Sequence, residues 1–277
     1  MLPFLLIQTR SDDAVAADEV RSTTVLGGFG PGELVTLRLD QVVAAAGPSS
    51  GGTADLDWAQ VVPRHSGVIV GGSPFTSSDP DEFKSDLQIV VEAELRRLLD
   101  VVLERDVPFL GACYGVGTLG LHQGATVDGT FGEPAGAVVV RLTEAGRADP
   151  LLAGVDPEFE AFVGHKEAIR TLPGHAVVLV AGDACPVQMF RIGRHQYATQ
   201  FHPELDLEGL LYRLETYADN GYYDPAEAAD LFARVRAATV TEPRKVLENF
   251  RARYARRGSD PFDPSPVRRR DRRPGLG

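Results

Sequence analysis

Short apolar runs alternate with longer amphipathic segments along the chain. The clearest helical pattern covers residues 79–105, where apolar side chains recur at the spacing of one helix face. Asp79, Pro80 and Glu82 supply an N-cap, a first-turn proline and a capping-box acid, so they predict the start of this helix. The apolar positions are Phe83, Leu87, Val91, Leu95, Leu98 and Val102.

Apolar runs bounded by glycine, proline or charged residues predict strands before and after this helix. The β-α-β order favours a parallel sheet with helices on both faces. Later runs follow one another at short spacing, so we expect some of them to pair as hairpins. The predicted strands are 3–9, 34–42, 66–74 and 107–115 before the spacing shortens, and 135–143, 175–182, 186–193 and 195–204 after it.

The pattern changes to helical after residue 204. Segments 205–221, 224–238 and 242–257 each have helical character. We therefore expect a catalytic unit over residues 1–204, a helical extension over 205–258 and a disordered basic tail over 259–277.

Composition and charge argue against several classes of protein. The net charge of −11 argues against general nucleic-acid binding, which needs clustered Lys and Arg. No apolar run approaches the ~20 residues of a membrane span, and we interpret the apolar opening residues as a strand, not a signal peptide. Two cysteines are too few for a disulfide scaffold, which predicts a cytoplasmic protein.

One of the two cysteines lies where a predicted strand turns into a helix. The segment Val107–Gly124 reads VPFLGACYGVGTLGLHQG, so Gly111, Ala112 and Gly115 surround Cys113 with small residues. A strained turn that exposes a nucleophile needs such neighbours, and the start of a helix favours a thiolate. The backbone N–H of Tyr114 can then face an oxyanion. The alternative is that Cys113 is a small apolar residue of the core.

A base for this thiol occurs about ninety residues later. His202 and Glu204 flank Pro203 in the segment ATQFHPELD. Residues two apart in an extended segment point to the same side, so Glu204 can fix the tautomer of His202. The alternative is a surface histidine beside a carboxylate. Cys185 precedes a proline and has no base nearby in the sequence, so we expect a structural role. The cysteine and histidine spacings predict no metal site.

Several segments together resemble the class I, or triad, glutamine amidotransferases, and among these the glutaminase domain of GMP synthase. They are GACYGVGTLG, VIVGGSP, GEPAGAVVVRLTEAG and ACPVQMFRIGRHQYATQFHPE, and the resemblance covers about residues 1–204. It implies a flavodoxin-like α/β fold with a mainly parallel sheet and helices on both faces. It also implies an enzyme without a cofactor.

The resemblance implies a role for each matching residue. Cys113 corresponds to the nucleophile that forms a γ-glutamyl thioester and releases ammonia. His202 corresponds to the residue that moves the proton, and Glu204 to the residue that holds the histidine. Gly72 and Tyr114 correspond to the backbone donors of the oxyanion hole. Gly71 matches the first glycine of the pair on the neighbouring strand and is expected to contribute to substrate binding.

Two substrate-binding positions depart from the family pattern. Gly117 stands where relatives carry a glutamine that holds the substrate. His165, in VGHKE, falls where relatives carry a Ser-His segment, and we expect it to line the substrate pocket. The other interpretation of His165 is a loop histidine.

The ammonia acceptor is not evident. We find neither a Ser-Gly-Gly-x-Asp-Ser phosphate loop nor a Gly-x-x-x-x-Gly-Lys-[Ser/Thr] motif in the chain. The expected function is therefore a stand-alone glutaminase or amidotransferase that delivers ammonia to a partner synthetase. The alternatives are a γ-glutamyl peptidase or hydrolase, and a regulatory subunit with little turnover.

Overall fold

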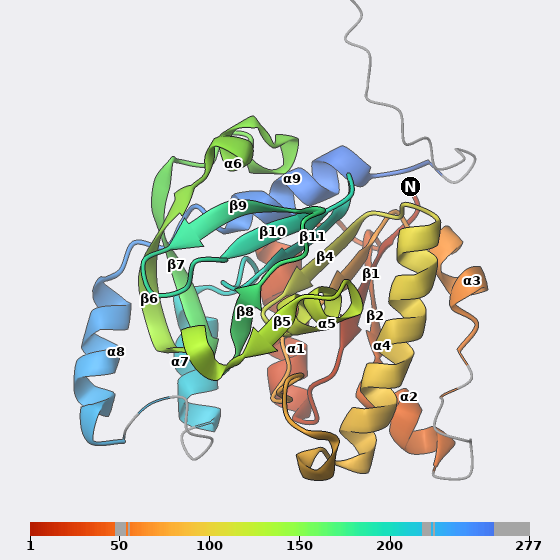
Figure 1. Ribbon diagram of the computed structural model, residues 1–277, viewed down its shortest axis with the longest axis horizontal. Helices are drawn as coiled ribbons and strands as arrows, with labels where there is room; N and C mark the ends of the chain where they lie inside the picture. The colour runs from red at the N-terminus through yellow and green to blue at the C-terminus, as the bar shows by residue number, and fades with distance from the viewer. Residues whose placement is uncertain (48–53, 55, 218–222, 224, 258–277) are drawn as a thin grey trace, which may run out of the picture.

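The computed structural model describes residues 1–47, 54, 56–217, 223 and 225–257. Within them a mixed sheet has the strand order β2-β1-β3-β4-β11-β10-β9-β6-β7 (Figure 1). In this spatial order, each neighbouring pair among β2, β1, β3, β4 and β11 is parallel. Each neighbouring pair among β11, β10, β9, β6 and β7 is antiparallel. The sheet strands are β1 (Phe4–Gln8), β2 (Leu34–Arg38), β3 (Val68–Val70), β4 (Phe109–Ala112), β6 (Glu133–Leu142), β7 (Glu158–His165), β9 (Ala176–Gly182), β10 (Met189–Ile192) and β11 (Gln196–Thr199).

Helices cover both faces of this sheet, which confirms the expected α/β architecture. On one face, Leu5 and Ile7 of β1 pack with apolar side chains of four helices. Each amphipathic helix buries the apolar side chains of one of its faces against the sheet, as Val91, Leu95 and Leu98 do in α4. These helices are α2 (Leu39–Ala46), α3 (Trp58–Val61), α4 (Asp86–Glu104) and α5 (Tyr114–His122).

The opposite face carries helices from both ends of the chain. Phe4 and Leu6 of β1 share one apolar core with Leu247 and Phe250 of α9 (Arg244–Tyr254). In Figure 1 the blue α9 accordingly lies along the sheet. Residues after 204 thus complete the core that the first strand begins. The other helices are α1 (Asp13–Leu26), α6 (Glu144–Ala148), α7 (Leu207–Thr216) and α8 (Ala228–Ala237).

Small elements connect these layers. A second sheet pairs β5 (Thr126–Asp128) with β8 (Ala168–Thr171). The 3₁₀ turns are η2 (Val62–Arg64), η3 (Asp81–Phe83), η4 (Gly129–Phe131), η5 (Pro150–Leu152) and η7 (Pro225–Glu227). In the part of the chain that the structure describes, no helix is long and apolar enough to cross a membrane.

Several local predictions were wrong at their boundaries or missed an element, and strands β5, β7 and β8 were among those missed. Helix α4 begins at Asp86 with Ser85 as its N-cap, because the Ser85 side chain accepts from the N–H of Gln88. The segment that begins at Asp79 forms only the η3 turn. Residues 39–42 continue as α2 rather than as strand β2. Helix α1 was missed because its sequence is weakly amphipathic, although Asp12 caps it.

Candidate active site

The site forms where two adjacent parallel strands end. Strands β4 and β11 pair in parallel, with Ala112 opposite Thr199. Cys113 follows β4 directly, and its backbone N–H donates to the carbonyl oxygen of Thr199 at 2.7 Å. The segment that leads to His202 follows β11. The register of one strand pair therefore brings together two segments that lie far apart in the sequence.

Cys113 occupies a strained corner. Its φ is 52° and its ψ is −86°, in a region that L residues rarely adopt, and it forms the N-cap of α5. A Cβ on Gly111 would stand 2.7 Å from the Cα of Gly115, so only glycine fits at position 111. The turn therefore requires glycine at position 111 and places the Cys113 side chain at the helix N-terminus.

The imidazole of His202 lies between a carboxylate and the cysteine. Its Nδ1 donates to Oε1 of Glu204 at 2.8 Å, and the ring lines one pocket together with Cys113. Because Nδ1 is engaged by Glu204, Nε2 is the nitrogen left for the sulfur. His202 and Glu204 are both buried.

Burial and charge act in opposite directions on this pair. Burial by itself lowers the pKa of His202, but the charges of Glu204 and Cys113, with their hydrogen bonds, raise it to about 9. Burial by itself raises the pKa of Glu204, but the charge and hydrogen bond of His202 and the charge of Arg213 lower it well below its ordinary value. At neutral pH the ring therefore carries a proton that it can donate.

A buried ion network extends behind the histidine. Arg213 of α7 places Nη1 3.3 Å from Oε1 of Glu204 and Nη2 3.7 Å from Oε1 of Glu19. The same Glu19 oxygen accepts from Nε of Arg10 at 2.9 Å. These four side chains are nearly inaccessible to solvent, so each charge depends on its neighbours. Sequence reasoning missed Arg10, Glu19 and Arg213, because no local spacing relates them to His202.

Replacing Arg213 with methionine is expected to lower the free energy of unfolding by about 2 kcal/mol, because Glu19 and Glu204 lose a buried cation. Urea denaturation measures the change. Arg213→Lys is the matched control, since it keeps the charge and is expected to recover at least half of the loss. Equal stability of wild type and Arg213→Met would show that the network contributes nothing.

The glycine pair after β3 is enclosed by this network. A Cβ on Gly72 would stand 2.6 Å from Nη2 of Arg10 and 3.1 Å from Cε1 of His202. A Cβ on Gly71 would stand 2.7 Å from the Glu19 carboxylate. A side chain at either position would therefore have to displace the end of a buried charged side chain. Position 72 borders both Arg10 and the triad candidate His202, whereas position 71 borders Glu19.

His165 belongs to a buried hydrogen-bonded cluster. One ring nitrogen contacts the carbonyl oxygen of Glu167 at 2.9 Å, and the other contacts Oε2 of Glu133 at 2.9 Å. Gln188 donates to the same Glu133 oxygen at 2.6 Å. His165 lines a pocket with Cys113, but both of its nitrogens already have protein partners. His165 is therefore part of the pocket wall, and both of its ring nitrogens are engaged by the protein.

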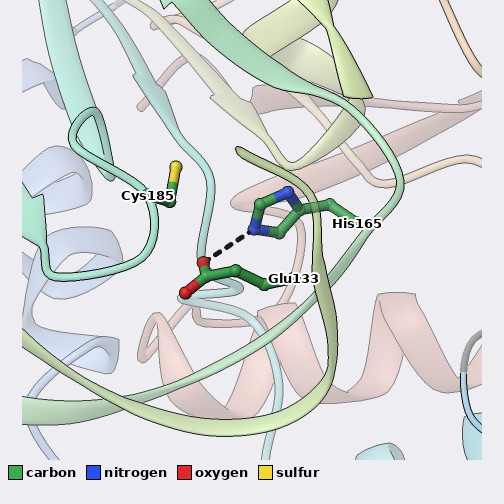
Figure 2. Close-up of side chains that lie close together, drawn as sticks. All are labelled: Glu133, His165 and Cys185. Atoms are coloured by element: carbon green, nitrogen blue, oxygen red, sulfur yellow. Dashed lines mark hydrogen bonds and ion pairs between the residues drawn. The ribbon is translucent and has the colours of Figure 1, made fainter. Parts of the chain in front are cut away.

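Cys185 lies beside this cluster, in the arrangement that Figure 2 shows. One ligand atom each from Glu133, His165 and Cys185 lies within 4.8 Å of the others, a grouping that the sequence spacing did not predict. Burial raises the pKa of the Cys185 thiol to about 12, and the thiol donates to the carbonyl oxygen of Val187. A metal ion needs a thiolate and an unprotonated imidazole nitrogen. The hydrogen bonds instead favour a structural cluster.

Two pockets meet at the cysteine. The first is lined by Cys113 with Glu167 and residues that follow β3. The second is lined by Cys113, His202 and mainly apolar side chains of the chain after residue 204. The residues of this second group are Leu205, Leu210, Arg213, Leu214 and Tyr217. A group attached to the sulfur therefore has space on two sides.

The chain matches a known class of enzymes. Residues 59–209, more than half of the chain, match the family model described as "Glutamine amidotransferase class-I". The chain belongs to this family, as the resemblance of its motifs implied. Arg213 lies beyond the matched residues.

Similar curated proteins carry the name GMP synthase [glutamine-hydrolyzing]. That of Hamiltonella defensa is 27% identical over 145 residues, which is 50% of this chain and 25% of the relative. A relative from Thermoplasma volcanium, named as one subunit of such a synthase, is 28% identical over 141 residues, 50% of this chain and 62% of the relative. The chain thus matches about a quarter of the full-length synthases and under two thirds of the separate subunit.

Solved structures agree on the fold. A glutamine amidotransferase from Thermotoga maritima superimposes with a TM-score of 0.66 at 18% identity, covering 92% of this chain and 98% of the other. One from Methylobacillus flagellatus gives a TM-score of 0.62 at 19% identity, with 92% and 94% covered. At these identities the likeness concerns the fold alone.

Proposed function

We propose that the protein hydrolyses the side-chain amide of glutamine with Cys113 as nucleophile, His202 as proton carrier and Glu204 as the residue that orients the histidine. The observation that carries this proposal is the pocket that the His202 ring and the strained Cys113 line together, with Nδ1 of the ring held by Glu204. Membership of the amidotransferase family supports the choice of glutamine.

The proposed reaction has two halves. His202 takes the proton of the Cys113 thiol, the sulfur attacks the amide carbon, and the resulting oxyanion accepts from the backbone N–H groups of Gly72 and Tyr114. His202 gives its proton to the departing nitrogen, so the C–N bond breaks and ammonia leaves a γ-glutamyl thioester. Water, deprotonated by His202, then attacks the thioester and releases glutamate and the thiol.

Two measurements test the proposal. Purified protein incubated with glutamine is expected to release ammonia and glutamate in equal amounts. A chloroketone analogue of glutamine is expected to alkylate Cys113, read as a mass increase on the peptide that contains it. No adduct together with no ammonia release, with or without a synthetase partner, would end the enzyme proposal and favour a regulatory role.

The pKa of His202 gives a prediction for pH. The rate constant kcat for glutamine is expected to fall as the pH rises through about 9, because the ring loses the proton that it donates. Glu204→Gln removes the carboxylate that raises this pKa, so the alkaline limb is expected to move to lower pH. Initial rates between pH 6 and about 10 measure the alkaline limb of the wild type and that of Glu204→Gln. An unmoved limb in Glu204→Gln would contradict the assignment.

The same shifts set the direction of the pH dependence of stability. The folded-state pKa of His202 is raised. The stabilisation that its protonated ring gives to the folded state is therefore complete below the ordinary pKa of 6.5 and is lost as the pH rises through about 9. Because the pKa of Glu204 is lowered, its contribution is complete above its ordinary value of 4.5 and is lost as the pH falls.

The acceptor of ammonia is proposed to belong to a separate chain. The Thermoplasma volcanium relative carries the name of one subunit of a GMP synthase, which supports a partner synthetase for this chain. Co-purification of the tagged protein, with partners identified by mass spectrometry, tests this. A synthetase that increases ammonia release on addition supports the proposal, and a fully active protein without a partner contradicts it.

The second pocket favours one other candidate function. Its apolar wall from Leu205, Leu210 and Leu214 gives space beside the sulfur for a leaving amine larger than ammonia. The protein would then act as a γ-glutamyl hydrolase on a γ-glutamyl amide. Comparing kcat/KM for glutamine with kcat/KM for γ-glutamyl amides of increasing size decides between the two functions.

A further inference from the structure

The space above Gly117 is filled by the carboxylate of another segment. A Cβ on Gly117 would stand 2.7 Å from Oε1 of Glu167 and 2.7 Å from Oγ of Ser77. Glycine at position 117 therefore makes room for a glutamate that comes from the connection between β7 and β8. A longer side chain at position 117 and the observed position of Glu167 exclude each other.

Several donors hold Glu167 in this place. The backbone N–H of Ser77 donates to Oε1 at 2.9 Å, and that of Ser78 donates to Oε2 at 2.6 Å. The ring of His165 contacts the carbonyl oxygen of Glu167 at 2.9 Å, and Glu133 holds the other side of that ring. Each carboxylate oxygen still has a free lone pair after accepting one N–H. The group can therefore accept from a ligand.

This carboxylate belongs to the pocket of the cysteine. Cys113 and Glu167 line it together, and among its described lining residues Glu167 is the only acid. Gly117, beside Glu167, comes one turn after Cys113, the N-cap of α5. In a γ-glutamyl group, three carbon–carbon bonds separate the amide carbon from the α-carbon. A substrate attached at Cys113 can therefore extend through this pocket toward Glu167.

We infer that Glu167 binds the α-ammonium group of the substrate and selects γ-glutamyl compounds with a free α-amine. This inference rests on the proposed attack of Cys113 on a γ-glutamyl amide. An ammonium group supplies N–H donors and a positive charge that complement this carboxylate. Glu167 thus takes a binding role that sequence reasoning sought at Gly117 and His165.

The test compares glutamine with glutaramate, which has the same amide but no α-amine. Glu167→Gln is expected to raise KM for glutamine about 10- to 100-fold, because a charge-assisted hydrogen bond is lost. KM for glutaramate is expected to stay within about twofold of its wild-type value, since no ammonium is present to bind. The wild type is accordingly expected to prefer glutamine, and Glu167→Gln to lose that preference.

A matched control distinguishes the loss of a direct contact with the substrate from the general loss of one negative charge. Glu92 contacts the hydroxyl of Tyr114 from outside this pocket, so Glu92→Gln is expected to keep the wild-type ratio of the two substrates. Equal losses for glutamine and glutaramate in Glu167→Gln would overturn the inference and leave a structural role. So would an unchanged KM for glutamine. Failure of the proposed function is distinct, because the wild type would then release no ammonia from either amide.

Discussion

Replacing Cys113 with alanine is expected to abolish ammonia release from glutamine, by at least ~10³-fold in kcat. The thioester cannot form without the sulfur, and Ser73, which also lines both pockets, accepts from the backbone N–H of Phe75. A coupled glutamate dehydrogenase assay measures the residual rate. The chloroketone adduct is expected to disappear in the same variant.

The control for this result is the stability of the variant. Alanine keeps a Cβ at a φ of 52°, so Cys113→Ala is expected to unfold within about 1 kcal/mol of the wild type. Cys113→Gly removes the strain of that corner and is expected to be more stable than Cys113→Ala by about 1 kcal/mol. A folded Cys113→Ala protein with wild-type ammonia release would refute the nucleophile assignment. Cys185→Ala is the matched cysteine control and is expected to keep the activity.

Replacing Phe250 with alanine is expected to lower the free energy of unfolding by about 3–5 kcal/mol. Its ring is fully buried and contacts the rings of Phe4 and Tyr254, with centroids 5.7 Å and 5.0 Å away. The loss leaves a cavity between α9 and the first strand of the sheet. Urea denaturation followed by far-UV circular dichroism measures it.

Phe83→Ala is the matched control, because Phe83 is 76% exposed and its loss leaves no cavity. We further propose that the helices after residue 204 and the catalytic unit before it unfold together. A single transition that moves as a whole in Phe250→Ala supports this proposal. A separate early transition, with the main one unmoved, would show that α9 is an independent extension.

Sequence reasoning pointed to the candidate site because the two signals for it are local. The small residues around Cys113 predict a turn by steric argument alone, and the spacing of His202 and Glu204 predicts a hydrogen bond within three residues. The apolar period of α4 predicted that helix, although a stronger cap at Ser85 moved its start. The sequence offers more than one possible N-cap residue for this helix, and the packing of the folded helix determines which one is used.

Other parts of the site had no local signal. Arg213 and Glu19 lie almost two hundred residues apart, and each by itself resembles an ordinary charge on a helix. Glu167 follows a histidine and a lysine in a segment whose spacing points to no chemistry. Their roles depend on which helix covers which face of the sheet and on which loop folds over Gly117.

The chain by itself determined the kinds of elements, the class of chemistry and the residues able to perform it, because side-chain size, periodicity and pairs two to four residues apart act within a turn or a strand. The three-dimensional structure alone decided that the ends of β4 and β11 meet, that α7 supplies a cation behind Glu204, and that a carboxylate replaces a side chain at position 117. These contacts join segments whose separation along the sequence carries no information about distance, and only the register of the sheet and the packing of its two faces fix them.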